Sequence, residues 1–207
     1  MDQIVYWLNK HTKYNQEEWI KKPTIFATQA IEYLPRTGKL LDLGAGQGQD
    51  SIYFADHGFD VTATDFSQFA LDKITDSRIN KQIIDLSKPL AITVNSFDVV
   101  YSHLALHYFD LSRTKALFEE IYKILKPGGV LATLVNTTDD PEVNQSQRIE
   151  EDLYITPSDL QKRFFSTKSI AQFTSKFETL LLDNKGETHK DEIKTLVRYI
   201  GRKPKDS

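Results

Sequence analysis

Short apolar runs alternate with amphipathic stretches along the middle of the chain, from about residue 25 to residue 136. In the run 59–65, Phe59, Val61 and Ala63 alternate with polar residues, as expected for a strand. Strands and helices that alternate with short connections predict a parallel sheet with helices on both faces. The predicted strands are 39–44, 59–65, 82–85, 96–102 and 129–135, with helices at 51–58 and 68–74.

The most regular helix pattern follows the fourth predicted strand. Its apolar residues recur at the 3.6-residue spacing of one helix face. Asp110 or Ser112 is placed to cap its N-terminus, and the Lys-Pro-Gly-Gly segment at 126–129 ends it. The apolar residues of this face are Leu117, Phe118, Ile121, Ile124 and Leu125.

The C-terminal part of the chain has a different pattern. Residues 156–164 are predicted to form a helix, with Thr156 or Ser158 as its cap. Apolar segments then follow with only loops between them, so we expect strands that extend the sheet in the antiparallel sense. Polar residues at 183–192 predict a turn or hairpin loop. The predicted C-terminal strands are 169–173, 177–183 and 194–203.

The first 35 residues carry large aromatic side chains and no strand pattern. We expect helices here, which either form a lid over a ligand site or pack on the sheet. The expected organisation is an N-terminal helical lid segment, 1–35, and a main domain, 36–207, within one structural domain overall. The aromatic residues of the first segment include Tyr6, Trp7, Tyr14 and Trp19.

Composition narrows the possible functions. The 207 residues carry a formal net charge of -3 at pH 7, which is too small to attract nucleic acid or a membrane by bulk charge. The chain has no cysteine, which excludes disulfides, thiolate metal sites and cysteine nucleophiles. No stretch has the apolar character of a signal peptide or of a membrane span of about 20 residues. We therefore expect a cytoplasmic protein with no membrane partner and no clear nucleic-acid signal.

The segment LLDLGAGQGQD, at 40–50, places three glycines between a predicted strand and a predicted helix. Glycine lets the backbone bend sharply and approach a ligand closely. The following helix offers free N–H groups and the positive end of its dipole to a carboxylate or phosphate. A tight turn without a ligand is the alternative interpretation of the glycines alone. Their spacing, Gly-x-Gly-x-Gly, departs from the Gly-x-Gly-x-x-Gly of dinucleotide-binding loops.

The charges around this loop indicate which ligand it could hold. Asp65 closes the next predicted strand, where an acid can bind ribose hydroxyls, and it is also placed to cap the following helix. Residues 40–72 contain six aspartates and no lysine or arginine. This pattern disfavours a diphosphate and favours a sulfonium, an ammonium and a ribose diol, as in S-adenosylmethionine. We expect its carboxylate near residues 49–50 and its ammonium near Asp42 and Gly44.

Segments from residue 40 to residue 133 resemble, in order, the motifs of the class I S-adenosylmethionine-dependent methyltransferases. The resemblance implies a Rossmann-like α/β fold with a seven-stranded, mostly parallel sheet, helices on both faces and an antiparallel C-terminal strand. Within the family, the chain is most similar to small tellurite-resistance methyltransferases, through GQGQDSIYFADHGFDVTATD and the late GETHKDE. The family motifs are LLDLGAGQG, VTATDFS, IIDL, FDVVYSHLALHYF and ILKPGGVLAT.

The resemblance implies a role for each motif residue. Asp65 would bind the ribose diol and Phe66 would lie against the adenine ring. Asp85 would accept from the adenine amino group, the Leu86 N–H would bind the ring, and Tyr101 would flank the methionine moiety. Phe66 and Leu86 as core residues, and Asp85 as a strand terminator, are the alternatives. The expected cofactor-binding residues are Asp42, Gly44, Ala45, Gly46, Gly48, Asp65, Phe66, Asp85, Leu86 and Tyr101.

The acceptor side of such a site carries fewer signals. Methyl transfer needs an aligned donor and acceptor, and it needs a base only if the nucleophile must lose a proton. His103 and His107 are the candidate bases, and a packed neutral histidine is the alternative for each. A metal held by this pair would lack a third ligand, so we expect no metal. Tyr108, Tyr14 and Trp19 are candidates for the wall of the acceptor pocket.

The sequence therefore predicts an enzyme that transfers a methyl group from S-adenosylmethionine to a small-molecule acceptor. The alternative is a sensor that binds S-adenosylmethionine, or a non-catalytic interaction module on the same fold. The glycine spacing and the missing basic residues oppose a third class, the nicotinamide-dependent oxidoreductases.

Overall fold

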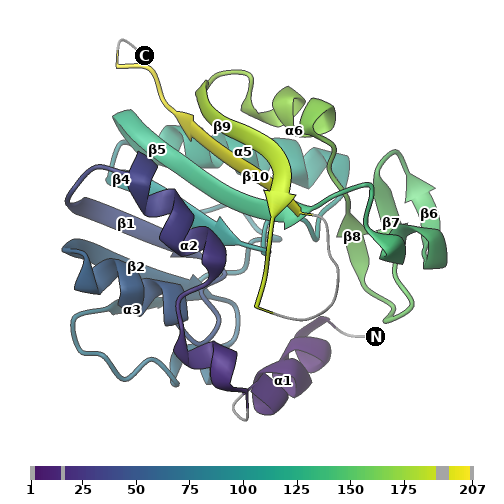
Figure 1. Ribbon diagram of the computed structural model, residues 1–207, viewed down its shortest axis with the longest axis horizontal. Helices are drawn as coiled ribbons and strands as arrows, with labels where there is room; N and C mark the ends of the chain where they lie inside the picture. Colours follow the sequence, from purple (N-terminus) through teal and green to yellow (C-terminus); the bar gives the residue numbers. More distant parts are fainter. Residues whose placement is uncertain (1–2, 15–16, 190–195, 206–207) are drawn as a thin grey trace.

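A seven-stranded sheet forms the centre of the molecule (Figure 1). Its strands are β1 (Gly38–Leu43), β2 (Phe59–Asp65), β3 (Asn80–Ile83), β4 (Phe97–His103), β5 (Leu125–Asn136), β9 (Glu178–Gly186) and β10 (Leu196–Arg202). Their order is β3-β2-β1-β4-β5-β10-β9, in which the first five are parallel and β10 is antiparallel to both β5 and β9. This computed structural model, which describes residues 3–14, 17–189 and 196–205, confirms the predicted Rossmann-like α/β fold.

Helices cover both faces of the sheet, because side chains of successive strand residues point to opposite sides. Leu40 packs into one apolar cluster with Phe26 and Phe54, whereas Leu41 packs into another with Phe118. The first face is covered by α2 (Ile25–Ala30), α3 (Gln49–Asp56) and α4 (Gln68–Leu71), and the second by α5 (Leu111–Ile124) and α6 (Thr167–Thr174).

Helix α5 is the regular helix that the apolar spacing predicts. Asp110 caps it, because its side chain accepts a hydrogen bond from the Arg113 N–H at 2.7 Å. Its apolar face is buried in the second cluster, and Leu125 at its end is already the first residue of β5. The predicted strands at 177–183 and 194–203 correspond to β9 and β10, although residues 194–195 lie outside the described part of the chain.

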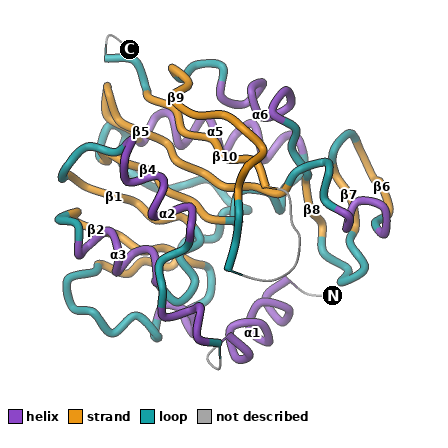
Figure 2. Tube along the Cα trace, in the orientation of Figure 1, coloured by secondary structure: helices purple, strands orange, loops and turns teal. Residues whose placement is uncertain are grey.

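The predicted helix at 156–164 is wrong. This segment instead forms a turn and β8 (Gln161–Arg163), which joins β6 (Gln147–Glu150) and β7 (Leu153–Ile155) in a second, antiparallel sheet (Figure 2). Thr156 accepts a hydrogen bond from the Leu160 N–H at 3.3 Å, and Asp159 has a left-handed φ of 59°. The polar residues that could cap a helix close a tight turn here, which is their other common use.

The predicted strand at 169–173 is also wrong, because this segment belongs to helix α6. Ser166 and Ser169 form a reciprocal capping box at its start. Ile170 and Phe173 are three residues apart, which places both on the face that packs against the second cluster. The predicted polar loop at 183–192 begins later than expected, since β9 continues to Gly186; residues 190–192 lie outside the described ranges.

The N-terminal segment is helical, as predicted. It contains α1 (Gln3–Tyr14) and α2, with two short 3-10 helices, Glu18–Lys21 and Ile31–Tyr33. Figure 1 shows α1 at the lower edge of the molecule, and α1 contacts α4. Within the described ranges, no helix is both long and apolar enough to cross a membrane.

Candidate functional site

A cavity of about 640 Å³ lies beside the C-terminal ends of β1, β2 and β4, where Asp42, Asp65 and His103 reach its wall. Ligands of open α/β sheets bind at this edge, and the volume is within the range of about 300–1,000 Å³ for small-molecule sites. The predicted site residues on its wall are Asp42, Gly44, Ala45, Gly46, Asp65, Phe66, Asp85, Leu86, His103 and Tyr108.

The glycine loop, which follows β1, is held at the cavity wall by backbone hydrogen bonds to β2. The N–H groups of Gly44 and Ala45 donate to the Thr64 carbonyl at 2.9 and 2.8 Å. Gly44 has a φ of 76°, and a Cβ there would lie 2.3 Å from the Cβ of Ala105. Any larger side chain would therefore displace the loop that follows β4, and the site requires glycine at this position.

Asp65 ties the second strand to the glycine loop. Its carboxylate accepts hydrogen bonds from the N–H groups of Gly46, at 3.0 Å, and Ser67, at 2.9 Å. The side chain of Ser67 caps the short helix α4. Asp65 is therefore held rigidly at the wall by backbone donors and does not itself serve as the helix cap.

Three carboxylates crowd one end of the cavity: Asp42, Asp50 and Asp65. Asp42 is 2% exposed, and burial raises its pKa to about 8, to which the neighbouring Asp50 and Asp65 charges add. The Ser51 hydroxyl, which donates to Asp42 at 2.6 Å, opposes this shift in pKa. Burying several ionised carboxylates together is unfavourable in free energy, and a bound cation reduces this cost.

Asp50 is positioned by groups from two other elements. It accepts hydrogen bonds from the N–H and hydroxyl of Thr24, at 2.7 and 2.8 Å. The Tyr101 hydroxyl donates to it at 2.7 Å. The sequence pattern did not identify Thr24 as a site residue, and its only local signal is its position as the N-cap of α2.

Two of the predicted cofactor-binding residues, Tyr101 and Gly48, lie behind the described wall of the cavity. Neither is among the described wall residues of the cavity. Tyr101 is fully buried and its ring stacks on Phe26 at 5.7 Å, so it touches the site through Asp50 rather than directly. Gly48 begins α3 with a φ of 80°, and a Cβ there would lie 2.5 Å from Ile74. Tyr101 therefore acts by holding Asp50, and Gly48 by allowing the backbone turn that begins α3.

The loop after β3 forms the second end of the cavity, together with Phe66. Burial alone would raise the pKa of Asp85, but hydrogen bonds from Ser87 and the adjacent Lys88 hold it below its ordinary value. Asp85 is therefore ionised and available as an acceptor at the wall. Leu86 lies beside it, with its carbonyl bound by Arg113 at 2.7 Å.

The segment after β4 separates the two candidate histidines. His103 reaches the cavity wall, whereas His107 is 1% exposed and is not among the described wall residues. The geometry therefore does not support His107 as a base that touches a ligand. Leu104 between them has a φ of 57°, a strained conformation that bulky residues adopt rarely and often at functional sites.

Aromatic and histidine side chains from distant segments close the cavity. The Trp7 ring of α1 meets the Tyr108 ring edge-to-face at 5.7 Å, and both line the wall. His189 also lies on the wall, with its Nε2 2.9 Å from the Pro23 carbonyl oxygen. Sequence analysis did not single out His189, although it lies in the GETHKDE segment that carries the closer family resemblance. The side chains of Tyr14 and Trp19 lie outside the described part of the structure.

Among the described residues, no group of three or more histidine, aspartate or glutamate side chains is arranged to hold a metal ion.

Comparisons with known proteins point to methyltransferases. Residues 41–133 match the family model of a methyltransferase domain. The malonyl-(acyl-carrier protein) O-methyltransferase of Enterobacter lignolyticus is 30% identical over 137 residues, which are 65% of this chain and 54% of that protein. The chain spans about half the length of the curated relatives it matches.

Solved structures share the fold. The 1,6-didemethyltoxoflavin-N1-methyltransferase of Burkholderia thailandensis, with bound 1,6-didemethyltoxoflavin and S-adenosylhomocysteine, matches with a TM-score of 0.75 at 20% identity, over 98% of this chain and 86% of that one. TehB of Haemophilus influenzae matches with a TM-score of 0.65 at 18% identity, over 86% of this chain and 61% of that one. With the seven-stranded sheet, these findings show a Rossmann-like methyltransferase fold, within which residues 41–133 match a methyltransferase domain.

Proposed function

We propose that this chain transfers a methyl group from S-adenosylmethionine to a small-molecule acceptor. The observation that carries the proposal is the crowding of Asp42, Asp50 and Asp65 beside a glycine loop at the carboxyl edge of the sheet. Three buried acids oppose a diphosphate and suit a ligand that brings an ammonium and a sulfonium. Burial and the neighbouring Asp50 and Asp65 charges raise the pKa of Asp42, and a cation bound beside it would favour its ionised form.

The residues present fit the methyl donor. Asp65 would accept from the ribose hydroxyls, and the Gly44–Gly46 backbone would lie against the methionine part. Asp42 would face the ammonium, while Phe66, Asp85 and Leu86 would hold the adenine, as the family resemblance implies. When bound, the donor supplies a methyl carbon activated by its positive sulfur.

The chain's own part in the reaction is alignment and the exclusion of water. His103 and Tyr108 both line the wall, and we assign to His103 the role of accepting a proton if the nucleophile carries one. His107, packed against the Tyr108 ring at 4.4 Å, supports that wall from inside the protein.

Closure of the cavity from the N-terminal side favours a small acceptor. Trp7, Ile20 and Thr24 all reach the wall, so residues 1–35 act as a lid on the domain formed by residues 36–207. A macromolecular acceptor would require this cover to move aside. We place the enzyme in the cytoplasm, where its methyl donor is made.

Turnover tests this function. The purified protein should form S-adenosylhomocysteine from S-adenosylmethionine when amines, phenols and other neutral nucleophiles are supplied, and His103→Asn should slow this by about 10²–10⁴ if the proton must be removed. His107→Asn should leave donor affinity unchanged. Tight binding of the donor, with no turnover over a broad acceptor panel, would favour a sensor instead.

A further inference from the structure

The charges on the cavity wall restrict which acceptor can enter. Asp42, Asp50, Asp65 and Asp85 supply the carboxylates. The only lysine or arginine among the described wall residues is Lys88, which already lies 3.3 Å from the Asp85 carboxylate. Acidic side chains therefore outnumber lysine and arginine on the described wall.

The donor does not reverse this imbalance. S-adenosylmethionine has a sulfonium, an ammonium and a carboxylate, so it adds one net positive charge to a wall with four carboxylates and one lysine. A phosphate, carboxylate or oxyanion entering beside it would lose its hydration without gaining a strong positive partner. A neutral or cationic molecule avoids this cost.

The acceptor side of the wall is apolar and aromatic. Trp7, Ile20, Tyr108 and Phe109 contribute to it, and the edge-to-face contact of Trp7 with Tyr108 leaves ring surface toward the cavity. Such rings bind flat apolar bodies and attract cations. Resting on the proposed function, we propose that the acceptor is a neutral or cationic small molecule with an apolar body, and that anionic acceptors are rejected.

Binding of matched probes to the protein saturated with S-adenosylhomocysteine tests this. The probes share one ring and differ in charge: tyramine, 4-methylphenol and 4-hydroxyphenylacetate, with inorganic phosphate added as a simple anion. Ligand-observed NMR should show that the first two bind at least tenfold more tightly than the anions. Trp7→Ala should weaken them about tenfold without changing affinity for S-adenosylhomocysteine. Tyr122→Ala, in α5 and not among the described wall residues, should change neither.

Equal or tighter binding of 4-hydroxyphenylacetate or phosphate would overturn the inference, and so would the absence of binding by tyramine and 4-methylphenol. Failure of the proposed function is distinguishable, because it would appear first as no binding of S-adenosylhomocysteine.

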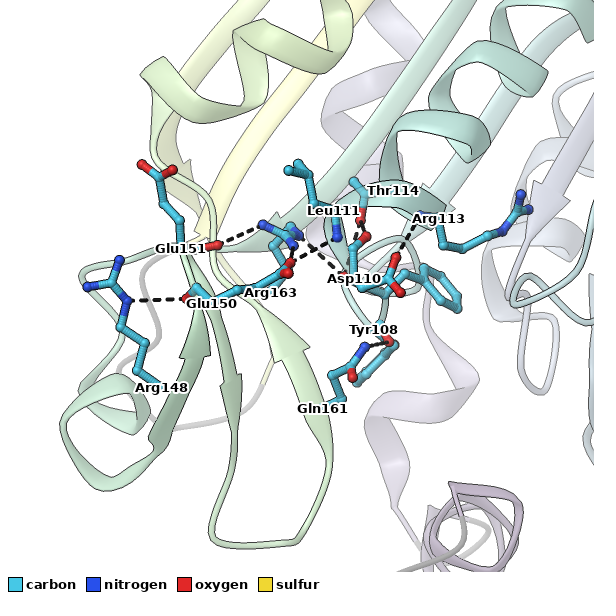
Figure 3. A network of polar contacts seen from close by, with 11 residues as sticks. Tyr108, Asp110, Leu111, Arg113, Thr114, Arg148, Glu150, Glu151, Gln161 and Arg163 are labelled. Atoms are coloured by element: carbon cyan, nitrogen blue, oxygen red, sulfur yellow. Dashed lines mark hydrogen bonds and ion pairs between the residues drawn. The ribbon is translucent and has the colours of Figure 1, made fainter.

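A separate observation concerns two arginines that hold the two ends of the cavity. Arg163, the last residue of β8, has a side chain that is 4% exposed and forms an ion pair with Glu150 (Figure 3). Its Nε donates to the Phe109 carbonyl at 3.3 Å, and its backbone N–H donates to the His107 carbonyl at 2.7 Å. Glu150 in turn accepts from the Leu111 N–H at 2.9 Å.

These contacts connect the small sheet to the segment that carries Tyr108 and Phe109. Gln161 of the same strand adds a long hydrogen bond, 3.4 Å, to the Tyr108 carbonyl (Figure 3). The aromatic wall is thus fixed by backbone contacts from behind, and β6, β7 and β8 are the scaffold that supplies them. None of these groups needs to touch the acceptor.

Arg113 of α5 plays the corresponding part for the loop after β3. Its Nε donates to the Leu86 carbonyl and its Nη2 to the Lys88 carbonyl, both at 2.7 Å. Glu120 holds the guanidinium in place, with Nη1 to Oε1 at 2.9 Å. We infer that Arg113 is a positioning residue for the adenine side and Arg163 one for the acceptor side.

Paired variants separate these roles. Arg113→Met should raise the Kd for S-adenosylhomocysteine at least fivefold and speed amide exchange in residues 84–90. Arg163→Met should leave that Kd within twofold but speed exchange in residues 105–111. Arg198→Met is the matched control, because Arg198 is also largely buried and pairs with Asp183, and neither residue is among the described wall residues of the cavity; it should lower Tm without either effect.

A purely structural role would be indicated if both cavity variants changed Kd and exchange alike, or if neither differed from Arg198→Met, and either result would overturn the inference. If Arg163→Met does not fold, Arg163→Lys keeps the charge but loses the planar fork, and it should show the same exchange pattern in weaker form.

Discussion

Replacement of Asp42 by asparagine should stabilise the protein without cofactor, although it removes a hydrogen-bonded side chain. The pKa of Asp42 rises from 3.8 to about 8 in the fold, because the carboxyl is buried beside Asp50 and Asp65. A group whose pKa is raised on folding stabilises the protein fully below its unfolded pKa, and this contribution is lost as pH rises toward the folded pKa. Asparagine does not titrate and can still accept the Ser51 hydrogen bond.

The size of the effect follows from the pH interval. Between pH 5 and pH 8, the wild type should lose about 1.4 kcal/mol per pH unit through this group, or roughly 4 kcal/mol as an upper figure. At about 2–4 °C per kcal/mol for a protein of this size, the Tm difference between variant and wild type should grow by at most roughly 8–16 °C over that interval.

Scanning calorimetry from pH 5 to pH 8 without cofactor measures this directly. Other carboxylates titrate in both proteins and cancel in the difference. Asp98→Asn is the matched control: burial alone would raise the pKa of Asp98, but Lys126 and the Lys39 N–H lower it, so its loss should destabilise the protein throughout this range. Parallel Tm curves for wild type and Asp42→Asn would refute the claim that Asp42, buried beside two other acids, lowers the free energy of unfolding as pH rises.

Further predictions concern the cofactor. Binding of S-adenosylhomocysteine at pH 7 should release close to one proton, since its ammonium favours the ionised form of Asp42; calorimetry in buffers of different ionisation heat would show it, and no dependence on buffer would contradict it. Asp65→Ala should weaken S-adenosylhomocysteine by roughly 1.5–3 kcal/mol, the scale of hydrogen bonds to a charged group; unchanged affinity would remove Asp65 from the site. Gly44→Ala should abolish binding, because its Cβ would lie 2.3 Å from Ala105, whereas Gly58→Ala, at a similar φ of 87° with its nearest neighbour 3.6 Å away, should cost stability only.

The donor half of the site could be predicted from sequence because its determinants are local. Gly44 and Asp65 each mark the end of a strand, and parallel strands bring their carboxyl ends to one edge of a sheet. The charge pattern of residues 40–72 then selects the ligand class. The sequence position of Tyr101 near a strand end does not reveal that its hydroxyl donates to Asp50.

The acceptor half could not be predicted because it is assembled from distant segments. The rings of Trp7 and Tyr108 are in contact although about half of the sequence separates the two residues, and His189 reaches the wall from the loop after β9. His103 and His107 look alike in sequence, and only the left-handed turn at Leu104 places one at the wall and buries the other. The small sheet was missed because turn residues at 156–159 also resemble a helix cap.

Calorimetric titration with S-adenosylhomocysteine at pH 8, in the presence and absence of NAD, tests the central claim most directly. An acidic crevice shaped for a cationic nucleoside predicts one molecule bound per chain, with an affinity that NAD does not alter. No detectable binding of S-adenosylhomocysteine, or its displacement by NAD, would contradict the account.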